Sequence, residues 1–115
     1  MKKHIFIITT CLLFSCKSDA ELSMERGIQY FDWGKYDEAI LEFNEAKYIQ
    51  IVDGEQTYDN LKLLAHTHYN LAITHAKLNN LNKAYDEAQR AFTLIPKREY
   101  KELLDLIKGQ QTNTQ

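Results

Sequence analysis

Hydrophobic residues recur every three or four positions along most of the chain, which is the period of an α-helix. Four apolar stripes of this kind follow one another, at Tyr36 to Ala46, Leu61 to Leu78, Leu81 to Ile95 and Tyr100 to Ile107. Each stripe would give a helix one face that must be buried against a neighbour. The pattern therefore predicts an all-α fold.

Residues that end or begin helices separate these stripes. Gly34 and Asn79 stand where a left-handed residue can end a helix, and Gly54 follows the second helix. Thr57 can cap the start of the third helix, and Pro96 separates the fourth from the fifth. The turns are short, so we expect two antiparallel helical hairpins followed by a C-terminal capping helix.

Small residues recur at the same intervals in both expected hairpins. They are Gly27, Ala39 and Ala46 in the first hairpin, and Ala72, Ala84 and Ala91 in the second. The chain resembles the tetratricopeptide repeat (TPR), a helix-turn-helix of 34 residues. The resemblance implies repeats at about 20–53 and 65–98 and a cap helix at about 97–108. Together they form a TPR-like helical domain at 20–108, which is a fragment of an α-solenoid.

The two repeats are farther apart than the family pattern requires. Gly34 and Asn79 are 45 residues apart, and the eleven additional residues fall between Ile51 and Ala65. Eleven residues make three helical turns, so the apolar stripes stay in phase. We therefore expect the second and third helices to be lengthened and joined by a short loop. Gly109 is expected to end the last helix, leaving 109–115 as a disordered polar tail.

The beginning of the chain has a different composition. Lys2 and Lys3 precede an apolar stretch at 5–14 that is too short to span a bilayer. The sequence Leu-Phe-Ser-Cys that ends at Cys16 resembles the bacterial lipobox. This resemblance implies a signal peptide at 1–15 and acyl chains such as palmitate on Cys16, with 16–19 forming a lipidated Cys and short tether. An uncleaved membrane anchor is the alternative.

The expected anchor places the protein in the bacterial cell envelope. The tether is short, so the domain should lie against the membrane. Lys17 stands where an Asp would signal retention in the inner membrane, which favours the outer membrane. Cys11 would leave with the signal peptide, so the remaining chain could form no internal disulfide.

Membership of the TPR family would also indicate a binding surface. The first helix of each repeat lines a concave groove in that family. The corresponding residues here are Met24, Ile28, Phe31, His66, Tyr69, Asn70, Ile73 and Lys77. These side chains would bind a protein partner in the groove. Alternatively, several of them are core residues that pack against neighbouring helices. Asn70 matches a residue of the family's carboxylate clamp, but its basic companions are missing, so no clamp is expected.

Other chemistry has little support in the sequence. His68 and His75 share a helix side but fall on the packing face, and no Cys or carboxylate cluster completes a metal site. Asp86 and Glu87 are expected at an exposed helix start. The net charge of −2 argues against nucleic-acid binding. We expect no enzymatic activity, no cofactor and no metal.

Three functions compete at this point. The first is a protein-binding adaptor in the envelope, anchored through the lipid on Cys16. The second is a structural or self-assembling subunit of an envelope complex, since two repeats leave apolar edges that a partner or a second copy could cover. The third, a small hydrolase or metal-binding protein, has the weakest basis.

Overall fold

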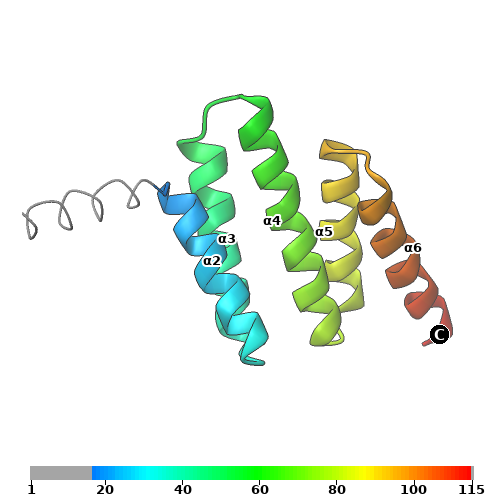
Figure 1. The fold of residues 1–115 in the computed structure, drawn as a ribbon. Helices are drawn as coiled ribbons and strands as arrows, with labels where there is room; N and C mark the ends of the chain where they lie inside the picture. The colour runs from blue at the N-terminus through cyan, green and yellow to red at the C-terminus, as the bar shows by residue number, and fades with distance from the viewer. Residues whose placement is uncertain (1–16, 115) are drawn as a thin grey trace, which may run out of the picture.

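The computed structural model describes residues 17–114, and these residues form five α-helices. The helices are α2 (Asp19–Asp32), α3 (Tyr36–Val52), α4 (Tyr58–Lys77), α5 (Leu81–Leu94) and α6 (Arg98–Asn113). α2 pairs with α3, α4 pairs with α5, and α6 packs on α5 (Figure 1). The predicted fold of two helical hairpins and a capping helix is confirmed. The predicted signal peptide and the acylation of Cys16 fall outside the described residues.

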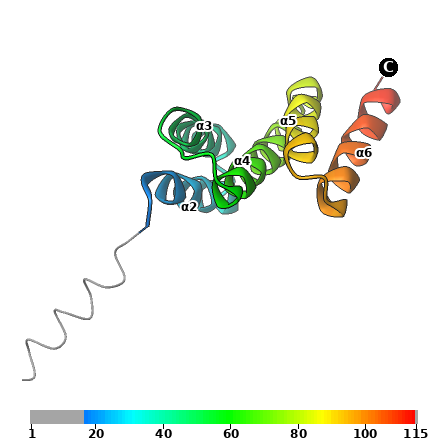
Figure 2. The same ribbon diagram turned by 90° about the horizontal axis from the view of Figure 1, so that it is seen from above.

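The helices form two layers. Seen from above, α3 and α5 lie on one side, while α2, α4 and α6 lie on the other (Figure 2). The chain alternates between the layers, so each new helix packs mainly against the one before it. No helix among residues 17–114 combines the length and hydropathy that a membrane-spanning segment needs.

The helix ends follow from local sequence chemistry. The Ser18 hydroxyl accepts from the backbone N–H of Glu21, and the Glu21 carboxylate accepts in return from the backbone N–H of Ser18. The Thr57 hydroxyl caps α4 by accepting from a backbone N–H at 3.1 Å. Gly34 and Asn79 take left-handed conformations, with φ of 75° and 60°. These turns reverse the chain at the ends of α2 and α4, as the sequence predicts.

The small residues lie where helices cross closely. Ala39, Ala84 and Ala91 are completely buried. Gly27 faces Phe43 across the α2–α3 contact, and a Cβ at position 27 would lie 2.5 Å from the Phe43 ring. Each hairpin therefore depends on residues without bulk at its crossing point.

The middle helices are longer than those beside them. α3 has 17 residues and α4 has 20, whereas α2 and α5 have 14 each. The predicted lengthening is confirmed, and the α3–α4 loop stands above the top of α5 in Figure 1. The first turns of α4 therefore extend beyond the cover that α5 provides.

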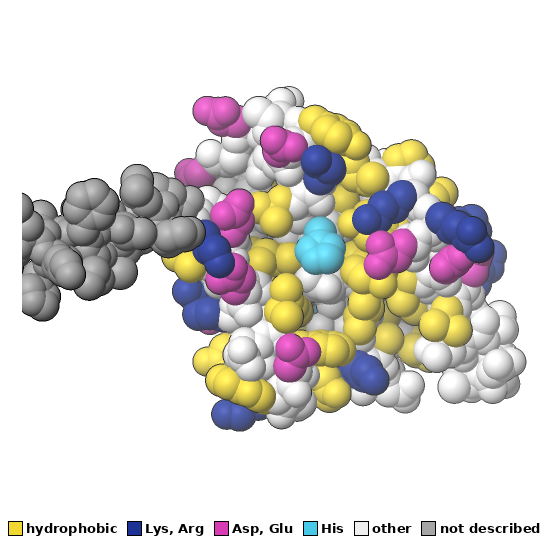
Figure 3. All heavy atoms as spheres, in the orientation of Figure 1, with side chains coloured by type: hydrophobic (Ala, Val, Ile, Leu, Met, Phe, Trp, Pro, Cys, Tyr) yellow, Lys and Arg dark blue, Asp and Glu magenta, His cyan; other side chains and the backbone are white. Residues whose placement is uncertain are grey.

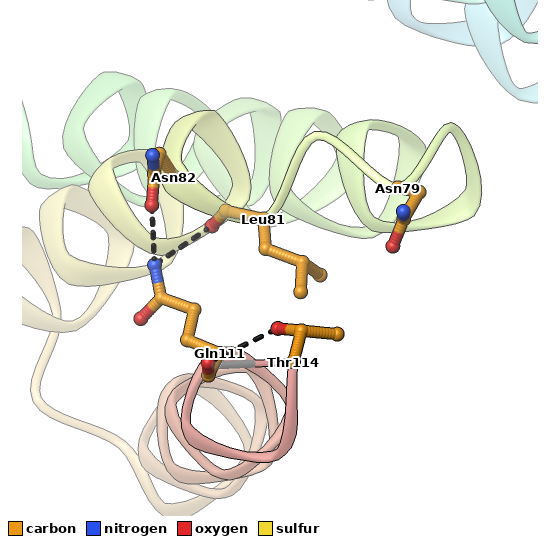
Figure 4. A pocket seen from close by; sticks show the side chains of 5 residues that line it. All are labelled: Asn79, Leu81, Asn82, Gln111 and Thr114. Carbon is orange, nitrogen blue, oxygen red and sulfur yellow. Dashed lines mark hydrogen bonds between the residues drawn. The ribbon is translucent and has the colours of Figure 1, made fainter.

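The C-terminal end of the domain differs from the prediction. α6 does not stop at Gly109 but continues to Asn113, so the expected unfolded tail is wrong for most of its length. The Gln111 side-chain amide donates to Asn82 Oδ1 at 2.9 Å and to the Leu81 carbonyl at 3.4 Å (Figure 4). The additional turn is thus held against the start of α5, beside a hollow of about 280 Å³.

Candidate protein-binding groove

A small hollow opens where α2, α3 and α4 meet. Its volume is about 80 Å³, and it is lined by Ile28, Phe31, Phe43, Asn70, Ile73 and Thr74. Four of the eight residues predicted to form a binding groove lie here, namely Ile28, Phe31, Asn70 and Ile73. Figure 3 views the side of the molecule formed by α2 and α4, where hydrophobic side chains lie among charged ones.

Helical spacing brings these four side chains together. Ile28 and Phe31 are three residues apart on α2, and Asn70 and Ile73 are three apart on α4, so each pair lies on one side of its helix. The Phe31 ring meets the Tyr36 ring edge-on, with 5.3 Å between centroids. Ile28 remains 40% exposed at the rim of the hollow. An apolar side chain of a partner protein could therefore contact Ile28 as it enters the hollow.

Asn70 gives the hollow its polar group. The Nδ2 atom of Asn70 is buried and has no hydrogen-bond partner. The neighbouring Thr74 hydroxyl is already used, because it donates to the backbone carbonyl of Asn70 at 2.7 Å. A buried donor without a partner costs free energy. A ligand carbonyl or carboxylate would remove that cost if the Asn70 amide turned toward the hollow to donate to it.

The other four predicted groove residues lie outside the hollow. Met24 is 4% exposed and belongs to the core, where the Thr67 hydroxyl lies 3.1 Å from its sulfur. His66 is exposed as a whole residue, although its ring stacks beside Tyr69 and is partly covered there. Lys77 is exposed in the last turn of α4. The predicted groove is therefore divided, with Ile28, Phe31, Asn70 and Ile73 forming a hollow and the rest serving other contacts.

Tyr69 is committed to a contact between helices. Its ring lies 5.1 Å from that of Tyr100 on α6. Burial raises the pKa of Tyr69, and the nearby Glu99 carboxylate raises it further. Burial and the charge of Lys97 lower the pKa of His66. Both rings therefore stay neutral at neutral pH, and the Tyr69 ring links α4 to α6 through Tyr100.

A buried ionic contact joins the two hairpins. His68 Nδ1 lies 2.5 Å from one Glu87 oxygen, and Lys47 Nζ lies 3.7 Å from the other. The contact thereby links α3, α4 and α5. Burial would raise the pKa of Glu87, but the hydrogen bond with His68 and the charges of His68, Lys47 and Arg90 outweigh it and lower the pKa.

Glu87 corrects a prediction from the sequence. It was expected at an exposed helix start, yet its side chain is only 15% exposed. The position was recognisable, because Glu87 follows Ala84 by three residues and precedes Ala91 by four, and both alanines lie on the packing face of α5. A charge on an apolar stripe indicates a buried partner, which here is His68.

His75 shares the α4 face of His68 and lies half-buried. Its Nδ1 atom has no hydrogen-bond partner, and burial lowers its pKa. Within residues 17–114, no group of three or more His, Cys, Asp or Glu side chains is placed to hold a metal ion.

No protein-family model matches this chain, and no curated protein matches it significantly.

Proposed function

We propose that this chain is a membrane-anchored adaptor that binds a segment of another cell-envelope protein in the hollow between α2 and α4. The observation that carries the proposal is an apolar hollow bordered by Ile28 and Ile73 and lined in part by Asn70, whose buried Nδ2 has no hydrogen-bond partner. Binding sites commonly combine apolar walls with a few polar groups that fix orientation.

The size of the hollow favours a protein partner over a small molecule. Pockets for drug-sized ligands usually enclose about 300–1,000 Å³, and this one has about 80 Å³. That volume suits a single apolar side chain, which would act as the anchor of a larger contact. A backbone carbonyl of the same segment would accept a hydrogen bond from Asn70.

The proposed anchor is a lipid on Cys16, supported by the lipobox resemblance of the preceding residues. Cys16 is two residues before Ser18, where the first described helix is capped, a reach of about 7 Å in extended chain. The domain would thus be held close to the membrane surface. We place it in the bacterial envelope, at the outer membrane rather than the inner one, because the residue after Cys16 is Lys17 and not the Asp that would signal retention in the inner membrane.

Co-purification with matched variants tests the adaptor proposal. Ile28→Glu introduces a charge at the rim of the hollow, whereas Leu41→Glu introduces the same charge on α3 at a site that is 70% exposed. Tagged full-length chains are purified from solubilised membranes, and the bound proteins are quantified by mass spectrometry. A partner depleted at least tenfold by Ile28→Glu and retained by Leu41→Glu supports the proposal. Equal recovery with both variants would refute binding at this hollow.

Self-assembly is the second candidate. Leu106 on α6 is 60% exposed at the end of the repeat array, where a further hairpin or a second copy could pack. Sedimentation of the lipid-free chain over a hundredfold concentration range tests this function. A monomer throughout would exclude it, whereas a dimer abolished by Leu106→Glu would favour it over the adaptor.

A further inference from the structure

Apolar side chains are exposed to solvent where the loop joins α3 to α4. Ile51 is 62% exposed, Val52 57% and Tyr58 65%. Ile51 and Tyr58 line a hollow of about 650 Å³ together with Leu61 and Leu64. We call Ile51, Val52 and Tyr58 the apolar tip.

The apolar tip follows from the lengthening of the two middle helices. α4 is six residues longer than α5, which corresponds to roughly 9 Å of helix, so the start of α4 extends beyond its neighbour. Ala65 is completely buried, whereas Leu61 and Leu64, nearer the tip, are only partly covered. Exposed apolar groups that cluster at one end of a molecule mark a contact with a partner or a membrane.

The described chain begins at this same end. α2 and α3 are antiparallel, so the first residue of α2 lies toward the last residue of α3 (Figure 1). Ser18, which caps α2, shares a hollow of about 490 Å³ with Asp59 and Asn60 of the first turn of α4. A lipid on Cys16, only two residues before Ser18, would therefore anchor the protein at the end that carries the apolar tip.

We propose that the apolar tip inserts into the lipid bilayer and forms a second membrane contact beside the acyl chains on Cys16. This inference rests on the proposed lipid anchor. A lipid alone fixes the distance of the domain from the membrane but leaves its tilt free. Two contacts at one end, the anchor and the tip, fix the orientation as well and direct the Gly34 turn away from the membrane.

The charges around the tip decide which lipid surface it fits. Asp53, Glu55 and Asp59 lie in the loop and the first turn of α4. The cations at this end, Lys62 and Lys17, are paired with Asp59 and Glu25. A surplus of carboxylates is repelled by anionic lipids, so the insertion is driven by apolar burial into zwitterionic lipid. Its extent should therefore change little between low and high salt.

The single tryptophan of the chain provides an internal control. Trp33 is 62% exposed in the turn after α2, at the far end of that helix from Ser18. The 14 residues of α2 span about 21 Å, so Trp33 should lie outside the hydrocarbon region. A second chain carries Trp33→Phe together with Tyr58→Trp, which moves the fluorophore to the apolar tip.

The experiment measures quenching of tryptophan fluorescence by brominated acyl chains. Both acylated full-length proteins are reconstituted into phosphatidylcholine vesicles with or without bromine. We expect at least threefold stronger quenching at position 58 than at position 33, in low and high salt alike. Adding Ile51→Glu should abolish the difference, whereas adding Leu41→Glu should leave it unchanged.

The outcomes separate this inference from the anchor. Intact mass of the same samples reports whether Cys16 carries acyl chains. An acylated chain with equal, weak quenching at both positions would overturn the insertion and leave the anchor standing, as would quenching abolished equally by Leu41→Glu. A chain without acyl groups would overturn both. Protection of position 58 by a co-purifying protein in place of lipid would also overturn the insertion.

Discussion

The contact between Gly27 and Phe43 gives the sharpest test of how the first hairpin is packed. Replacing Gly27 by Ala adds one methyl group, and its carbon would lie 2.5 Å from the Phe43 ring. Phe43 is 1% exposed and packs with Met24, Ala39, Ala46 and Leu71, so a shift of the ring would disturb the packing of this core cluster. Gly109 provides the matched control, because it lies inside α6 and a Cβ there meets no atom within 4 Å.

Two opposing contributions determine the outcome. Replacing Gly by Ala inside a helix stabilises a protein by roughly 0.5–1 kcal/mol. Overpacking a well-filled core costs about 1–3 kcal/mol. Gly109→Ala receives only the first contribution and should stabilise the domain. Gly27→Ala receives both and should be less stable than Gly109→Ala by about 1–3 kcal/mol, which is the cost of the steric conflict with Phe43.

Urea unfolding of residues 17–115, followed by circular dichroism, measures both free energies of unfolding. Adding Gly27→Ala to a Phe43→Leu protein should cost less free energy of unfolding than adding it to the unchanged protein. The smaller Leu side chain leaves room for the added methyl group. The reasoning would be refuted if Gly27→Ala stabilised the domain as much as Gly109→Ala.

Three other predictions follow from single contacts. Asn79→Ala should lower the free energy of unfolding by about 1–2 kcal/mol, because Asn79 has a left-handed conformation. Asn80 has a negative φ, so Asn80→Ala should cost less than half as much in the same unfolding assay. Burial lowers the pKa of His75 from 6.5, so on acidification the unfolded chain takes up the proton before the folded one does. The free energy of unfolding should therefore fall as the pH decreases below 6.5. His75→Gln should flatten the stability–pH profile in that range, and an unchanged slope would contradict this. Glu87→Ala should cost roughly 1–3 kcal/mol by leaving His68 without its buried partner, whereas Asp86→Ala on the exposed side of α5 should stay within about 0.5 kcal/mol.

The parts of the fold that were predictable depend on local rules. Gly34 and Asn79 mark turns because few residues accept a positive φ. Ala39 and Ala84 mark helix crossings because a larger side chain would hold the helices apart. The eleven-residue insertion was recognisable as helix because it preserved the phase of the apolar stripes.

The parts that were missed depend on contacts between distant segments. Gly109 indicated a helix end, yet α6 continues because Gln111 hydrogen-bonds to Asn82 at the start of α5. Glu87 appeared to be a surface charge until the structure placed His68 beside it. Neither pairing is encoded in spacing along one helix.

Half of the predicted groove residues line one hollow. The TPR resemblance named Ile28, Phe31, Asn70 and Ile73 among them, and helical spacing places each pair on one side of its helix. It could not indicate that Tyr69 would pack against Tyr100, because that contact depends on where α6 docks. The exposure of the apolar tip likewise depends on how far α4 extends beyond α5.

In-cell cross-linking from position 28 tests the central proposal most directly. A photoreactive amino acid replaces Ile28 in the full-length chain, in a second chain that also carries Cys16→Ala, and, as a control, at Leu41. We expect one envelope protein to be captured from position 28, with little capture from position 41 and at least a tenfold loss when the anchor is removed. Capture of no protein, or equal capture from positions 28 and 41, would contradict the adaptor function.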